Sequence, residues 1–225
     1  MNTPENEILK RRAFLRYAGA GAVITALTIT GCTNEDDMPM PDGEDGIYFG
    51  QGDTAVLNYA FALEQLEAAF YIKVIEAPFN GISELEMHYL TDLRDHEIAH
   101  REFFKTALGA NAISELEFDF SSINFGSRES VLATAKAFED LGVSAYNGAG
   151  GLLEDVNLLA LAGKIVSVEA RHAALIRDLI SNGSFADNSV IDSNGLDTSR
   201  SPSEVLSIAA TYISSQINVK DLPTY

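Results

Sequence analysis

Two copies of one residue pattern in this chain bring together side chains of the kinds that bind metal ions. In the first copy, Glu64 is followed seven residues later by Tyr71, and the pair Glu97 and His100 comes further along. The second copy repeats this order within residues 139–172. Four glutamates and two histidines projecting inward from four helices form the ligand set of a two-metal carboxylate site. The two tyrosines are interpreted as hydrogen-bond donors to the ligands, with redox-active tyrosines as the alternative. The predicted metal ligands are Glu64, Glu97, His100, Glu139, Glu169 and His172, and the predicted supporting tyrosines are Tyr71 and Tyr146.

Apolar residues recur with a helical period over four long stretches, which predicts the elements that would position these side chains. Ser83 with Glu86 forms a capping-box pattern, and the glycines within 148–151 are expected to end the third helix. No stretch alternates with period two, so no sheet is expected. The predicted fold class is all-α, a four-helix bundle with one long crossover over about 110–127 and a short fifth C-terminal helix. The expected helices run from 53 or 54 to the turn at 78–81, from 83 to 108, from about 127 to 147, from about 154 to 180 and from 201 to about 216.

The spacing also predicts the heights of the carboxylates, because residues equidistant from the turn of an antiparallel hairpin lie level with each other. Glu64 and Glu97 are equidistant from the predicted turn at 78–81. The midpoint of Glu139 and Glu169 is Glu154, about four residues past the glycine turn that is expected to end the third helix. The second hairpin is therefore less symmetric. Glu139 is therefore the least secure of the predicted ligands.

Within a helix, residues i and i+3 share a face, so each Glu-x-x-His pair can direct both side chains at one point. The glutamates of the two pairs could then bridge two ions. Carboxylate and imidazole ligands together suit iron or manganese rather than a thiolate zinc site. Glu67, one turn from Glu64, remains an alternative ligand, whereas His88 and His96 are expected to lie outside the site. The competing interpretation is that these are surface charges or hydrogen-bonded buried polar residues.

The composition describes an acidic globular protein. The 225 residues carry a net charge of −18, and 46% of them are hydrophobic, which suits one domain with a sizeable core. An acidic surface repels phosphate backbones, so nucleic acid is not an expected partner. With Cys32 as the only cysteine, no internal disulfide can form.

The N-terminal region is predicted to be a targeting sequence. Lys-Arg-Arg-Ala-Phe-Leu-Arg at 10–16 resembles a twin-arginine export motif, and Ile-Thr-Gly-Cys at 29–32 resembles the lipobox of bacterial lipoproteins. Lipid on Cys32 would anchor the protein in the bacterial cell envelope. The expected organisation is a signal peptide over 1–31, a flexible acidic tether over 32–53, the helical bundle over 54–182, and a loop with the C-terminal helix over 183–225.

Four runs carry a resemblance to a known superfamily. They are Leu-Glu-Gln-Leu-Glu-Ala-Ala-Phe-Tyr at 63–71, Asp-His-Glu-Ile-Ala-His at 95–100, Phe-Glu-Asp-Leu-Gly-Val-Ser-Ala-Tyr at 138–146 and Val-Glu-Ala-Arg-His at 168–172. They are similar to the ferritin-like superfamily, and more narrowly to ferritin-like domain proteins that include exported bacterial members and plant desiccation-related proteins. The resemblance covers about 54–182 and implies a ferritin-like bundle with a di-iron or di-manganese centre. It implies terminal carboxylates at Glu64 and Glu139, Glu-x-x-His carboxylates at Glu97 and Glu169, and imidazole ligands at His100 and His172.

These features predict a lipid-anchored envelope protein, exported by the twin-arginine route, whose two iron or manganese ions react with oxygen or peroxide. Whether it is an enzyme, as a di-metal oxidoreductase, is left open. The alternative is a non-catalytic ferritin-like lipoprotein that acts as a binding, metal-handling or stress-protection module. The expected partners are the membrane, through lipid on Cys32, and a small oxidant. A homodimer is compatible with the pattern.

Overall fold

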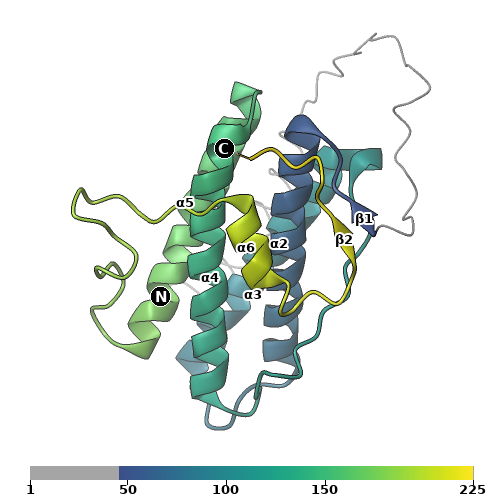
Figure 1. Ribbon diagram of the computed structural model, residues 1–225. Helices are drawn as coiled ribbons and strands as arrows, with labels where there is room; N and C mark the ends of the chain where they lie inside the picture. Colours follow the sequence, from purple (N-terminus) through teal and green to yellow (C-terminus); the bar gives the residue numbers. More distant parts are fainter. Residues whose placement is uncertain (1–45, 225) are drawn as a thin grey trace, which may run out of the picture. The chain divides into compact units, whose positions relative to one another are not determined.

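Four long helices form a bundle of two antiparallel hairpins (Figure 1). The computed structural model describes residues 46–224, so the export motif, the lipobox with Cys32 and most of the predicted tether lie outside the described residues. The predicted all-α bundle with one long crossover is confirmed. Its elements are β1 (Ile47–Tyr48), α2 (Gly52–Glu76), α3 (Glu84–Leu108), α4 (Arg128–Ala149), α5 (Val156–Ile180), α6 (Pro202–Ala209) and β2 (Ile217–Asn218), with 3₁₀ turns at Gly109–Asn111 and Gly150–Leu152.

The beginnings of α3 and α4 follow the cap residues in the sequence. Ser83 and Glu86 form the capping box of α3, and Ser127 caps α4. The C-terminal region departs from the prediction in two ways. The helix α6 is shorter than predicted, and the expectation of no sheet is wrong at one place, where β1 and β2 pair in parallel with Ile47 opposite Ile217. Strands of two residues are too short to produce a period-two pattern in the sequence.

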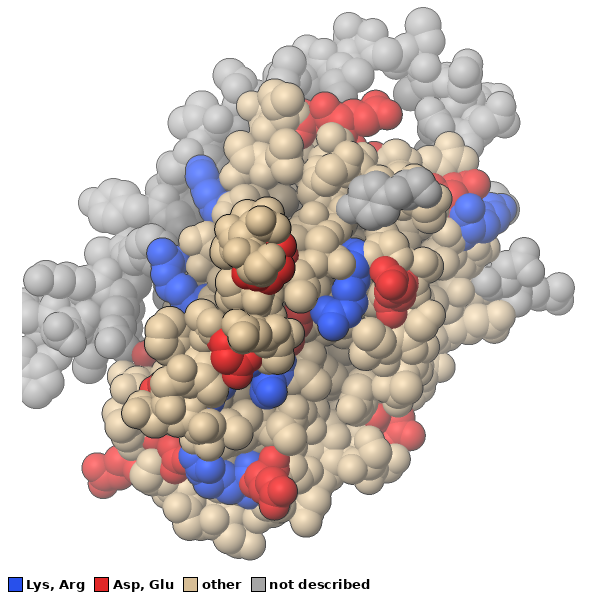
Figure 2. Space-filling model, turned by 60° about the vertical axis from the view of Figure 1, so that its left-hand side comes forward, with Lys and Arg blue, Asp and Glu red and all other residues tan. Residues whose placement is uncertain are grey.

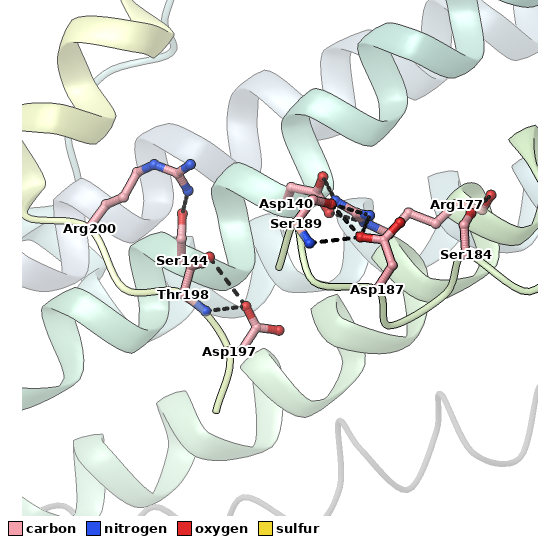
Figure 3. A network of polar contacts seen from close by, with 9 residues as sticks. All are labelled: Asp140, Ser144, Arg177, Ser184, Asp187, Ser189, Asp197, Thr198 and Arg200. Carbon is pink, nitrogen blue, oxygen red and sulfur yellow. Dashed lines mark hydrogen bonds and ion pairs between the residues drawn. The ribbon is translucent and has the colours of Figure 1, made fainter. Parts of the chain in front are cut away.

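The helix α4 passes through Gly148, where the sequence predicts a break. A Cβ at this position would lie 1.8 Å from the carbonyl oxygen of Arg200, so the missing side chain lets the C-terminal segment approach the helix. Arg200 is held there because its backbone N–H donates to the Ser144 carbonyl (3.0 Å) and its guanidinium to the Ser144 hydroxyl (2.7 Å) (Figure 3). Gly148 therefore serves close packing, and the helix continues to Ala149.

Replacing Gly148 with alanine is expected to destabilise the protein by about 1–3 kcal/mol, because the added methyl group overpacks the contact with Arg200. Chemical denaturation would measure the change. Gly163→Ala is the matched control, since Gly163 also lies within a helix and an added Cβ there meets nothing within 4 Å. Equal stability of the two variants would contradict the close-packing role of Gly148.

The helix α2 lies inside the bundle and needs cover on more than one side. Sixteen of its 25 residues are buried, against five of 25 in α3. The crossover that joins the hairpins lies along α2, and two polar side chains of α2 hold it by hydrogen bonds. Asn58 donates to the Asn111 carbonyl (2.8 Å) and accepts from the Ile113 N–H (2.9 Å), while Gln65 accepts from the Leu116 N–H (2.9 Å). The backbone groups of the crossover are thus satisfied next to the core.

The crossover also contributes aromatic side chains to the core. Phe120 is buried, and Phe118 and Phe125 are partly buried against the core. The ring centroid of Phe70 on α2 lies 6.2 Å from that of Phe120 and 6.0 Å from that of Phe125. These crossover phenylalanines thus pack on the bundle.

The surface of the described residues carries charges of both signs. On the face shown in Figure 2, Lys and Arg side chains lie interspersed with Asp and Glu side chains. None of the helices within residues 46–224 combines the length with the apolarity that a membrane span requires.

Candidate metal centre

The middle of the bundle holds four glutamates and two histidines that come from all four long helices. The four carboxylates are completely buried, and the histidine side chains are 4% and 14% exposed for His172 and His100. Every predicted ligand lies in this cluster: Glu64 on α2, Glu97 and His100 on α3, Glu139 on α4, and Glu169 and His172 on α5.

The six residues form two overlapping groups that share Glu97 and Glu169, and in each group the candidate ligand atoms lie within 4.8 Å of one another. Glu97 places Oε2 3.5 Å from His100 Nδ1 and Oε1 2.7 Å from His172 Nδ1. Glu169 places Oε1 2.8 Å from His100 Nδ1 and Oε2 3.8 Å from His172 Nδ1. Each shared carboxylate therefore presents one oxygen to each histidine, as a carboxylate does when it bridges two ions.

Each group draws its residues from both hairpins. Glu64 and His100 of the first hairpin are joined by Glu169 of the second, and Glu139 and His172 of the second are joined by Glu97 of the first. Neither hairpin supplies a complete group by itself. A complete group forms only when the two hairpins pack together.

Glu139, the least secure prediction, lies fully buried in the cluster. Because α4 continues through Gly148 to Ala149, the turn of the second hairpin spans 150–155 and begins two residues after Gly148. The midpoint of Glu139 and Glu169 lies within that turn, which removes the asymmetry expected from the sequence. The assignment of Glu139 as a ligand stays a prediction.

Two tyrosines hold the terminal glutamates from across the bundle. The Tyr71 hydroxyl donates to Glu139 Oε1 (2.5 Å), and the Tyr146 hydroxyl donates to Glu64 Oε1. Each tyrosine thus bonds the glutamate of the other hairpin rather than the one seven residues before it. Because α2 and α4 run antiparallel with the same seven-residue step, the tyrosine of each helix stands opposite the glutamate of the other (Figure 1).

Eight buried atoms of the cluster have no hydrogen-bond partner among the described residues. Nitrogen–oxygen distances within the cluster are as short as 2.7 Å. A buried polar atom without a partner costs about 1–3 kcal/mol, so convergent atoms of this kind fit a bound cation. Oxygen and nitrogen donors without thiolate suit iron or manganese. The atoms are both oxygens of Glu97 and Glu169, Oε2 of Glu64 and Glu139, and Nδ1 of His100 and His172.

Without metal, protons offset part of the negative charge of the cluster. Burial and the neighbouring Glu169 raise the pKa of Glu97 to about 8. Burial opposes the protonation of His100, but the carboxylates beside it, Glu169 first among them, outweigh burial and raise its pKa to about 12. Burial likewise opposes the ionisation of Glu169, yet the two histidines lower its pKa to about 2. Metal binding is therefore expected to displace protons from the cluster.

The metal-free protein is expected to lose stability as the pH rises from about 5 to 8. The pKa of Glu97 is about 8 in the folded state against an ordinary value of 4.5, so the folded state retains a proton that the unfolded state has lost. The stabilisation is complete below pH 4.5 and disappears as the pH rises through 8. Melting temperatures in chelator at several pH values would test this. Glu97→Gln should flatten the profile, and a wild-type profile that rises over this range would contradict the assignment.

Glu67, the alternative first-helix ligand, is buried but belongs to neither group. Its Oε1 lies 3.0 Å from where a Cβ of residue 142 would stand, so Gly142 provides the space for this carboxyl group. Burial and the charges of the surrounding glutamates raise the pKa of Glu67 well above its ordinary value. The structure places Glu64, not Glu67, beside His100 (3.3 Å).

His96 belongs to neither group of candidate ligands, but it contacts one of the predicted ligands. His96 Nδ1 lies 2.9 Å from His172 Nε2, and the two ring planes are nearly parallel. Successive side chains on a helix are about 100° apart, so His96 leaves the inward face of Glu97 but reaches α5 from the edge of α3. The second copy of the pattern has Val168 at the equivalent position, so the repeat did not reveal this contact. His88, in contrast, is exposed and pairs with Asp92 (3.5 Å), away from the cluster.

A bundle in which every long helix contributes a buried glutamate, and two helices contribute a Glu-x-x-His pair, defines the ferritin-like class of carboxylate proteins. The family model described as ferritin-like domain matches residues 52–182, more than half of the chain, and the chain therefore belongs to this family. No curated protein matches the chain in sequence. The family and the buried cluster together support a metal-binding ferritin-like protein. The individual ligand assignments and the narrower desiccation-related group stay predictions.

Proposed function

We propose that this protein is a lipid-anchored envelope protein whose ferritin-like bundle holds two iron or manganese ions and reduces a small oxidant such as peroxide or oxygen. The observation that carries the proposal is the bridging arrangement of Glu97 and Glu169. Each of these carboxylates offers one oxygen to His100 and the other to His172. Two ions that share two bridging carboxylates can change their oxidation states together while their ligands move little. When bound, such ions supply the electrons that reduce the oxidant.

The residues around the cluster support chemistry on a small molecule. The four glutamates are completely buried, so a large substrate has no access to them. Tyr71 and Tyr146 fix the two terminal glutamates by hydrogen bonds, which limits the reorganisation of the site. Burial and the neighbouring glutamates raise the pKa of Glu67, which favours the protonated form of this carboxyl group.

The proposal of a lipid anchor rests on the sequence that precedes the bundle. The resemblance to a twin-arginine motif suits a protein exported after it has folded and bound its metal, and the resemblance to a lipobox makes Cys32 the proposed site of the lipid. Growth with a radioactive or clickable palmitate should label the wild-type protein and leave Cys32→Ser unlabelled. Equal labelling of both proteins would contradict lipidation at Cys32.

Metal analysis followed by rapid mixing with peroxide tests the proposed chemistry. The wild-type protein loaded with iron or manganese should retain about two ions per chain and show a change in absorbance on mixing with peroxide. Glu97→Ala should lose both the ions and the absorbance change, because Glu97 belongs to both groups. Glu102→Ala, an exposed glutamate on the same helix, is the matched control.

The outcome separates the proposed redox centre from its alternative. Retained metal without any reaction with peroxide or oxygen would favour a non-catalytic, metal-handling module. Less than about one ion per chain after careful loading would contradict both functions that depend on metal.

A further inference from the structure

The contact between His96 and His172 joins an exposed residue to the buried cluster. His96 lies on α3 and His172 on α5, so the contact also links the two hairpins. His96 Nδ1 and His172 Nε2 are 2.9 Å apart, the ring planes differ by 6°, and the ring centroids are 5.1 Å apart. At this distance one nitrogen carries the hydrogen and the other accepts it.

The two nitrogens of His172 face different surroundings. Nδ1 lies among the carboxylates, 2.7 Å from Glu97 Oε1 and 3.5 Å from Glu139 Oε2, whereas Nε2 faces His96. A metal ion bound in the cluster would take the lone pair of Nδ1, which leaves the hydrogen of the neutral ring on Nε2. His96 Nδ1 is then the acceptor for that hydrogen, and the bond fixes both the tautomer and the orientation of His172.

The histidine of the other group has no comparable support. Within residues 46–224, the structure describes no hydrogen bond to Nε2 of His100. The side chain of His100 is also more exposed than that of His172. The two groups are otherwise alike, since each has a terminal glutamate held by a tyrosine and both share Glu97 and Glu169. His96 is therefore the residue that makes the two halves of the cluster unequal.

We propose that His96 is a positioning residue that holds His172 ready for metal, so that the His172 position binds its ion more tightly and fills before the His100 position. This inference rests on the proposed dinuclear function. A hydrogen-bond partner of a metal-bound histidine typically changes metal affinity by about 10–100-fold, which sets the size of the expected difference.

Manganese titration of the metal-free protein by calorimetry tests the inequality. The wild-type protein should show a tighter and a weaker binding step. His96→Ala should weaken the tighter step by about 10–100-fold and leave the other nearly unchanged. His96→Gln should restore part of the loss, because a glutamine oxygen can accept the same hydrogen. His88→Ala, which removes an exposed histidine from the same helix, should leave both steps unchanged.

Nitrogen-15 NMR of the histidine rings in the metal-free protein provides a second readout that does not depend on metal. A hydrogen-bonded His172 Nε2–H signal should be present in the wild-type protein and in His96→Gln and lost in His96→Ala. If this signal is absent from the wild-type protein, or if His96→Ala keeps both affinities, the positioning role is overturned. If the signal is present but the wild-type protein binds no manganese or iron, His96 does position His172, while the dinuclear function and the unequal filling are overturned.

Discussion

Glu169→Ala is expected to abolish metal binding at both positions, with a loss of affinity of about a hundredfold or more for each ion. Glu169 belongs to both groups and presents a different oxygen to each histidine. Its pKa of about 2 also makes it a carboxylate at every physiological pH, so it supplies a permanent negative charge to the site. Removing it leaves two histidines and three glutamates, of which Glu97 alone is shared by both groups.

A terminal ligand provides the comparison that makes this result specific. Glu139 belongs to one group alone, so Glu139→Ala should leave the ion at the His100 group bound. Metal analysis after desalting is expected to give about two ions per chain in the wild-type protein, about one in Glu139→Ala and none in Glu169→Ala. If Glu169→Ala retained two ions, Glu169 would not bridge them.

Arg177→Met is expected to destabilise the fold by about 3 kcal/mol. Arg177 is 3% exposed, and it donates through Nε and Nη2 to the two oxygens of Asp140 (2.8 and 2.7 Å). Its remaining contacts, with Asp187 (3.4 Å) and Ser189 (3.0 Å), attach the loop that follows α5 (Figure 3). Methionine keeps the apolar length of the side chain but leaves Asp140, which is itself mostly buried, without its cation.

Urea denaturation of two further variants would show that the lost ion pair causes this effect. Arg101→Met removes an exposed pair with Glu102 and should change stability by less than about 0.5 kcal/mol. Adding Asp140→Leu to Arg177→Met should recover part of the loss, because no unpaired carboxylate is left behind. A double variant no more stable than Arg177→Met alone would assign the effect to packing instead.

The helices and the identity of the cluster could be predicted because they depend on local patterns. Helical periodicity and the cap residues Ser83 and Ser127 placed the beginnings of α3 and α4. Within each hairpin, the i, i+3 spacing puts the glutamate and the histidine of a pair on one face, and the turn brings the glutamates of the two helices to the same level. These are short-range rules, and a single sequence contains them in full.

The features that the sequence did not reveal all depend on contacts between the hairpins or with the C-terminal segment. The tyrosines bond glutamates 68 and 82 residues away in the chain, and His96 bonds a histidine 76 residues away. Gly148 was interpreted as a helix breaker because glycine often is one, whereas the structure uses it for the approach of Arg200. Packing between distant segments decides each of these cases, and a single sequence carries no local signal for it.

The bonds from Tyr71 and Tyr146 also limit the coordination number of any metal in this bundle. Each tyrosine donates to Oε1 of a terminal glutamate, so Oε2 of Glu139 and of Glu64 is the oxygen left without a partner and would be the one to hold an ion. Each ion would then have four protein donors, namely one imidazole nitrogen, one terminal oxygen and two bridging oxygens. Ions that favour six ligands would retain coordination positions for molecules from solution. By occupying one oxygen of each terminal carboxylate, the two tyrosines would leave coordination positions of a bound ion to small molecules from solution.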